Sequence, residues 1–112
     1  MSAMFLFTEQ GILVNPDPSD NPDSHHVPSH EAGTQINFQV MNIGDEDGVA
    51  EVGVELDGNF VTQFSSNLLP PGGTEVGFVS LGRLETGTHT VLVFVNPGAG
   101  TADHLTNTFD VI

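Results

Sequence analysis

The stretch that decides the fold is TQINFQVM, residues 34–41, in which Ile36, Phe38 and Val40 alternate with polar side chains. Apolar residues at every second position are typical of a β-strand with one buried face. The same alternation recurs in VAEVGVEL, residues 49–56, and Asp57-Gly58 follows it directly. Asp-Gly between two such runs predicts a tight β-hairpin.

The rest of the chain also consists of short strand patterns separated by turn residues, and no helical period exceeds one turn. Residues 5–7 and 11–14 predict a broken first strand. Further strands are expected at residues 59–64, 74–81, 88–95 and 105–112. About seven short strands of this kind predict an all-β protein built as an antiparallel β-sandwich.

A long connection separates the first strand from the rest. Residues 15–30 contain four prolines, which cannot donate hydrogen bonds to a sheet, so we expect a loop or arm there. We therefore divide the chain into an N-terminal strand and Pro/His-rich loop, residues 1–33, and a sandwich, residues 34–112. Both parts are expected to belong to one folded unit.

Charge excludes several classes of partner. The 112 residues include 15 acids but only one Lys or Arg, Arg83, so the formal net charge is −14. Nucleic-acid binding is not expected, because it depends on Lys and Arg, and docking on anionic membranes is disfavoured for the same reason. The absence of cysteine excludes disulfides and thiolate metal sites.

The start of the chain has no basic region, and its apolar run is too short for a signal peptide or a membrane span. We therefore expect no insertion into a membrane. The sequence leaves the location open, and our expectation is an extracellular or particle-surface protein.

Several turn-and-strand motifs resemble those of CARDB domains, the immunoglobulin-like domains related to bacterial adhesion. These motifs are INFQVMNIG (residues 36–44), VELDG (54–58), LPPGG (69–73), GTHTVLVFVNP (87–97) and TNT (106–108). His89 and Asn96 depart from the family pattern. The resemblance covers residues 35–112 and implies a Greek-key, Ig-like sandwich that serves in adhesion or as a spacer. It implies no catalytic residues and no cofactor.

Two groups of residues suggest metal sites. His25, His26, His30 and Glu31 place three imidazoles and a carboxylate within seven residues, and zinc favours such ligands. The alternative is a solvated His-rich loop, or a contact that responds to pH.

Asp45 and Asp47, completed by Asp57 or Asp103, suggest an irregular calcium site. An EF-hand is excluded, because the fifth and twelfth positions counted from Asp45 are Val49 and Leu56. The alternative is a turn that uses Asp and Gly for its backbone geometry.

Two strands carry apolar residues on both faces, although only one face of each sheet meets the core of a sandwich. We expect an interface for a protein partner or a second subunit on the extra apolar face. The expected interface residues are Phe5, Phe7, Leu92, Phe94, Val79 and Leu81. The alternative is that the N-terminal segment covers this face.

These observations predict a non-catalytic Ig-like module that works by surface recognition, as a subunit or decoration protein of a virion-like or filament-like assembly. No motif for nucleophilic or dinucleotide chemistry is present. Carboxylate pairs for glycoside hydrolysis are compatible with the sequence, but it has no Trp or Tyr to stack a sugar and small sandwiches usually lack a deep cleft, so we do not expect an enzyme. Two alternatives remain. One is an adhesion or ligand-binding module of a secreted multidomain protein, and the other is a metal- or calcium-dependent binder.

Overall fold

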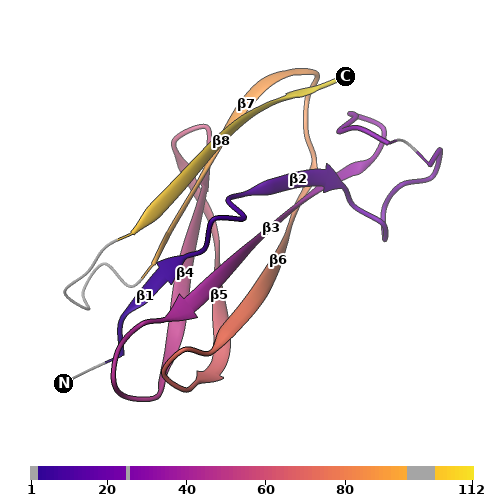
Figure 1. Cartoon of the computed structure of the whole chain (residues 1–112). Coiled ribbons are helices and arrows are strands. Elements are labelled where there is room, and N and C mark those ends of the chain that lie inside the picture. Colours follow the sequence, from indigo (N-terminus) through magenta and orange to yellow (C-terminus); the bar gives the residue numbers. More distant parts are fainter. Residues whose placement is uncertain (1–2, 25, 96–102) are drawn as a thin grey trace.

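A computed structural model describes residues 3–24, 26–95 and 103–112, which form strands in two antiparallel sheets (Figure 1). Within these residues the strands are β1 (Phe5–Phe7), β2 (Leu13–Pro16), β3 (Gly33–Asn42), β4 (Gly48–Leu56), β5 (Asn59–Leu69), β6 (Thr74–Arg83), β7 (Gly87–Val95) and β8 (His104–Val111). The prediction of an all-β, Ig-like sandwich is confirmed.

In the first sheet, sheet A, β1 and β2 pair with one side of β3, and β6 pairs with the other side. The second sheet, sheet B, has the order β5-β4-β7-β8. The chain leaves sheet B after β5, forms β6 in sheet A, and returns as β7 beside β4. This return beside an earlier strand is typical of Greek-key connections.

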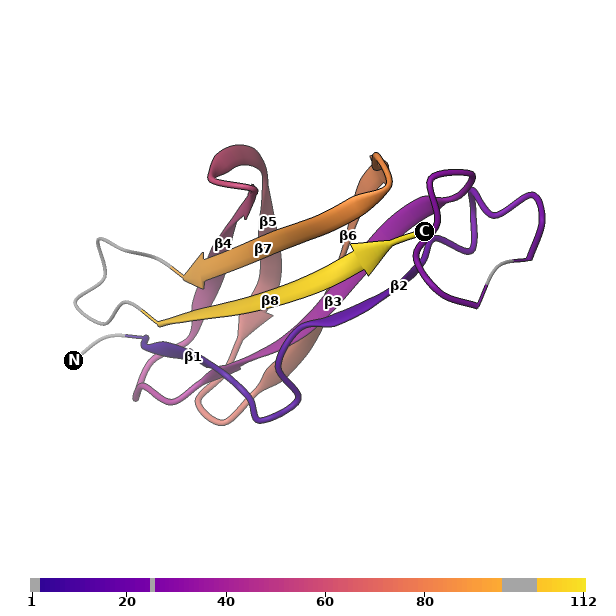
Figure 2. The same cartoon turned by 90° about the horizontal axis from the view of Figure 1, so that it is seen from above.

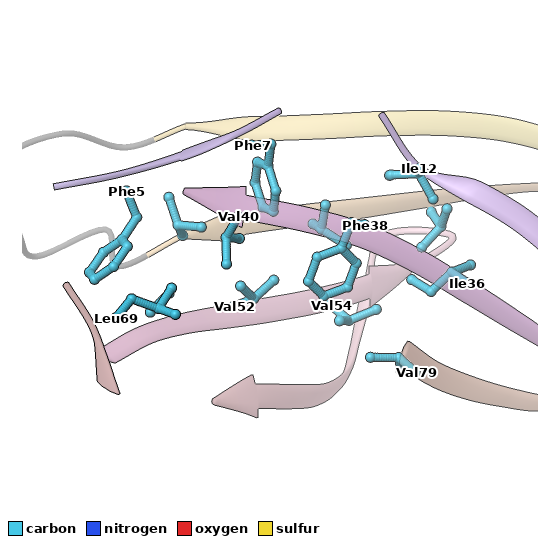
Figure 3. Close-up of a cluster of buried hydrophobic side chains, with 14 residues drawn as sticks. Phe5, Phe7, Ile12, Ile36, Phe38, Val40, Val52, Val54, Leu69 and Val79 are labelled. Atoms are coloured by element: carbon cyan, nitrogen blue, oxygen red, sulfur yellow. The ribbon is translucent and has the colours of Figure 1, made fainter. Parts of the chain in front are cut away.

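The core lies between the sheets and is built from the alternating residues that the sequence indicates. Ile36, Phe38 and Val40 of β3 face the inward valines of β4 and β7 and are fully buried (Figure 3). Phe38 makes edge-to-face contacts with Phe7 and Phe64, with ring centroids 5.8 and 5.5 Å apart. Aromatic pairs of this geometry contribute beyond the area that they bury.

β5 is five residues longer than predicted, because a β-bulge continues the strand through a polar stretch. The register with β4 shifts between Val49 and Glu51, which leaves the Ala50 N–H without a partner on the β5 backbone. The Ser66 hydroxyl accepts a hydrogen bond from this N–H at 2.8 Å and donates one to the Asn67 carbonyl at 2.7 Å. The serine side chain thereby satisfies the buried amide at the irregularity.

The long loop between β2 and β3 folds back onto its own chain beside the C-terminus (Figure 2). His30 N donates to the Ile112 carbonyl at 2.9 Å, and Ile112 N donates to the Pro28 carbonyl at 3.0 Å. Asp17 accepts a hydrogen bond from the Ser80 hydroxyl of β6 at 2.8 Å. The loop is therefore tied to the sandwich rather than extended as a free arm.

The molecule is elongated, with extents of 48 × 24 × 21 Å, and β1 and the C-terminus lie toward opposite ends of its long axis (Figure 2). The described residues include no helix that is long and apolar enough to cross a membrane.

Candidate interaction surface

Most of the outward face of sheet A carries no charged residue. Charges lie only at the end beside the β2–β3 loop, where the Ser80 hydroxyl donates to Asp17, and where Arg83, paired with Gly33, binds Asp20. Register places Leu13, Asn37 and Phe78 in one row across β2, β3 and β6, and Asn15, Gln35 and Ser80 in the next. We name this surface the neutral face. It ends at Ser80, which contacts the Asp17 carboxylate, and its members are the outward residues on the far side of Ser80 from Arg83: Leu6, Leu13, Asn15, Gln35, Asn37, Gln39, Met41, Thr74, Val76 and Phe78.

Apolar side chains flank a central row of amides on this face. Phe78 is 59% exposed, Leu13 46% and Val76 37%, whereas Leu6 and Met41 are half-buried. Large apolar residues that gather on one exposed face are typical of interaction sites.

Two amides of β3, those of Asn37 and Gln39, are held in place by the link between β1 and β2. Gln10 Nε2 donates to Asn37 Oδ1 at 3.0 Å, and the Thr8 hydroxyl donates to Gln39 Oε1 at 2.9 Å. These bonds orient the amides before any partner binds.

Apart from Asp17 and Asp20 beyond one end of this face, the acids of the strands point elsewhere. Glu51, Glu55 and Asp110 are on the outward face of sheet B. Glu75 of β6 is turned toward β5, where its Oε1 accepts hydrogen bonds from the backbone and side-chain nitrogens of Asn67 at 3.0 Å. The exposed Glu9 stands at the rim of the neutral face, between β1 and β2.

Three of the six predicted interface residues lie in the core instead. Phe5, Phe7 and Val79 are buried between the sheets. The two phenylalanines point inward because β1 extends sheet A by pairing with β3, so the N-terminal segment does not cover a second face. Leu81 also points inward and is half-buried against the core.

Leu92 and Phe94 lie on the outward face of sheet B, where they are half-buried. Phe94 pairs with Gly53 of β4, and its ring fills the space above this glycine, where a Cβ would come within 2.3 Å of the ring. Phe94 therefore packs mainly on its own sheet.

The sequence prediction missed Val76 and Phe78, because both faces of β6 are apolar. Gly77 was the available signal. It pairs with Phe38, whose ring would lie 2.7 Å from a Cβ at this position, so the Gly77 face must turn inward and Phe78 outward.

The predicted zinc ligands are only partly covered by the described residues. His25 lies outside them. The His30 ring forms a 3.0 Å hydrogen bond with the Ile112 carbonyl, and the Ser29 hydroxyl accepts from Glu31 N at 3.1 Å. In the part of the chain that the structure describes, no group of three His, Cys, Asp or Glu side chains could hold a metal ion.

The residues of the predicted calcium site do not come together. Asp45 and Asp47 precede β4 and Asp57 follows it. A nine-residue strand spans roughly 30 Å, so these carboxylates lie at opposite ends of the sandwich. Asp103 is also engaged, because its Oδ2 accepts a hydrogen bond from Phe7 N at 2.9 Å.

Asp57 instead joins two turns through His89. His89 Nδ1 lies 2.7 Å from Asp57 Oδ2, and Nε2 lies 2.7 Å from the Glu85 carbonyl oxygen. Both partners are acceptors, so the ring makes both bonds only as the imidazolium. The Glu85 carbonyl and the Asp57 carboxylate raise the pKa of His89, and the Thr90 N–H and the His89 ring lower the pKa of Asp57.

A shallow cavity of about 370 Å³ lies at the same end of the molecule, lined by His30, Arg83, Leu84, Glu85 and Thr86. Arg83 is the cation that would attract an anion there. Its guanidinium already binds Asp20 with two bonds, of 3.0 and 2.7 Å, so its charge is balanced within the chain. This ion pair also fastens the long loop to β6.

No family model and no curated protein sequence matches the chain. Among solved structures it is similar to a CARDB domain from Pyrococcus furiosus, determined in complex with di-metal ions. The TM-score is 0.66 at 12% identity, over 99% of this chain and 88% of that domain. The chain has a CARDB-like fold.

Two glycosidases also contain a similar domain. A GH2 β-galacturonidase from Eisenbergiella tayi gives a TM-score of 0.67 at 12% identity, and a β-glucuronidase from Bacteroides uniformis gives 0.67 at 16%. Both matches cover 95% of this chain but only 18% and 14% of the enzymes. The CARDB-like chain therefore spans a small part of these longer proteins.

Proposed function

We propose that this CARDB-like chain is a non-catalytic interaction module, a subunit or decoration protein of a larger assembly, and that it binds through the neutral face. The observation that carries the proposal is the absence of charged side chains from the neutral face of a chain with net charge −14. Burying an unpaired carboxylate is costly, so a face without charge is the least costly face to cover with a protein partner.

Several carboxylates make contacts within the chain that favour a structural role for these acids over a catalytic one. Asp17 accepts hydrogen bonds from Ser19 and Ser80, Asp20 binds Arg83, and Asp57 binds Thr90 and His89. Each of these groups stabilises a turn or a loop.

A second candidate function is an adhesion or ligand-binding module of a secreted multidomain protein. The glycosidase similarities favour it, because there this fold occupies a minor share of a longer chain. In that setting the neutral face would contact a neighbouring domain or a ligand rather than another subunit.

A photo-crosslinking amino acid placed at Phe78 tests the proposal in the cells or particles that contain the chain. Phe60, on the outward face of sheet B, is a matched control because it is 63% exposed. We expect crosslinks to protein from position 78 and few from position 60, with the chain fractionating in a complex larger than itself. Equal crosslinking from both positions, or a chain that fractionates alone without crosslinks, would contradict the proposal.

The metal-dependent alternative has its own test. Calcium or zinc added to chain treated with a chelator should leave the melting temperature unchanged. A rise that grows with metal concentration would favour this alternative.

A further inference from the structure

The neutral face has the properties required for pairing with itself. We propose that its occupant is a second copy of this chain, and that the two copies form a weak twofold dimer in which sheet A packs against sheet A. The inference rests on the proposed function, because it names the partner of the same face.

The many acidic side chains disfavour pairing of two copies through surfaces other than the neutral face. With 15 acids and one Arg or Lys, two copies that meet through most other surfaces bring carboxylates together. Across two neutral faces no such pair forms, because the charged groups on this side of sheet A, Asp17 and the Arg83–Asp20 pair, lie beyond one end of the neutral face.

The amide row gives the face self-complementarity. A side-chain amide carries both a donor and an acceptor, so Gln35, Asn37 and Gln39 of one copy match the same residues of another. In a twofold interface the same patch serves both subunits, and a row of amides fits this requirement without a second surface. Phe78 and Leu13 then supply apolar contact on either side of the row.

The size of the face sets the expected strength. Three strands across and about seven residues along give roughly 330 Å² of projected face on each copy, at about 4.8 Å and 3.3 Å spacing. The pair then buries about 660 Å² of projected face, well below the roughly 1,200 Å² of stable interfaces. We expect association in the micromolar range or weaker, strengthened by salt that screens rim acids such as Glu9.

Sedimentation of the purified chain over a concentration series tests the proposal at low and high NaCl. We expect a reversible monomer–dimer equilibrium that shifts toward dimer in high salt. Phe78→Glu should weaken association by about tenfold or more, because it places a carboxylate in both halves of the interface. Phe60→Glu, equally exposed on sheet B, should change it less than about twofold.

A mixture provides the control against misfolding. Phe78→Glu and Phe78→Lys should each be monomeric alone, and the mixture should form a heterodimer. A wild-type chain that stays monomeric in all conditions, or equal effects at positions 60 and 78, would overturn self-association. If self-association is overturned but position 78 still crosslinks to a different protein, the proposed function stands. Only the proposal that the partner is a second copy of this chain is then wrong.

Discussion

Asn42 is the buried polar residue that holds one end of the sandwich together. Its Nδ2 donates to the carbonyls of Glu46 and Leu69 at 2.8 and 2.9 Å, and its Oδ1 accepts from Gly44 N at 2.9 Å and Met4 N at 3.3 Å. One side chain thereby joins the segment before β1, the β3–β4 turn and the end of β5.

Asn42→Ala should therefore lower the free energy of unfolding by about 2 to 4 kcal/mol, because it leaves several buried backbone groups unpaired. Asn67→Ala, at an exposed position, should cost less than about 0.5 kcal/mol. Urea denaturation of both variants measures the difference. Equal, small losses would show that water replaces the Asn42 side chain without cost.

Two glycines covered by aromatic rings give a second comparison at the scale of single residues. Gly77→Ala places a methyl group 2.7 Å from the buried Phe38 ring and should cost about 1 to 3 kcal/mol. Gly53→Ala makes a still closer contact with Phe94, but this ring is half-buried at the surface and can move away. We expect a cost below about 1 kcal/mol there, measured in the same denaturation experiment.

At the scale of elements, the β4–β5 hairpin follows the sequence closely. Asp57 and Gly58 have φ angles of +52° and +85°, as a type I′ turn in the predicted hairpin requires. Asp57 also binds across to β7, where Thr90 N donates to its Oδ1 at 2.9 Å, and His89 continues the contact to Glu85. Nothing in the local pattern of residues 56–59 indicates this longer link.

The link should make stability depend on pH in two directions. The pKa of folded His89 lies above its ordinary 6.5, so its contribution is complete below pH 6.5 and is lost as the pH rises through the folded pKa. The pKa of folded Asp57 lies below 3.8, so its contribution is present above pH 3.8 and is lost as the pH falls through the folded pKa.

NMR titration of the His89 ring measures the first effect directly, and Asp57→Asn should lower its pKa. His89→Asn should remove the loss of stability above pH 6.5, whereas His104→Asn, which changes an exposed histidine of β8, should retain it. A His89 pKa at or below 6.5 would show that the folded chain does not stabilise the imidazolium.

Both the approximate extent and the inward face were predicted correctly for the strands with one polar and one apolar face. β3 is longer than predicted by one residue at each end, and β4 by one residue at its start. The alternation of polar and apolar residues in each strand allows only one inward face. The end of β5 was missed since Ser65, Ser66 and Asn67 look like turn residues, and only the bulge opposite Ala50 explains them. Which face of β6 points inward could not be predicted from β6 alone. Gly77 indicates the inward face only once its pairing with Phe38 of β3 is known.

At the scale of the whole molecule, the net charge of −14 is distributed over loops, turns and sheet B. Mutual repulsion of so many acids opposes the compact state, and salt screens it. Raising NaCl from about 0.05 to 0.5 M at pH 7 should increase the melting temperature by several degrees. Near pH 4.1, where the net charge approaches zero, the same change should have little effect, and calorimetry distinguishes the two cases.

The placement of β1 and the C-terminus toward opposite ends of a 48 Å molecule has a mechanical consequence. Tension applied between the chain ends would run along the strands and load their hydrogen bonds in shear. β8 holds to β7 through eight residue pairs, whereas β1 holds to β3 through three. Under force β1 would slide first, and the module would lengthen at that end while sheet B still held.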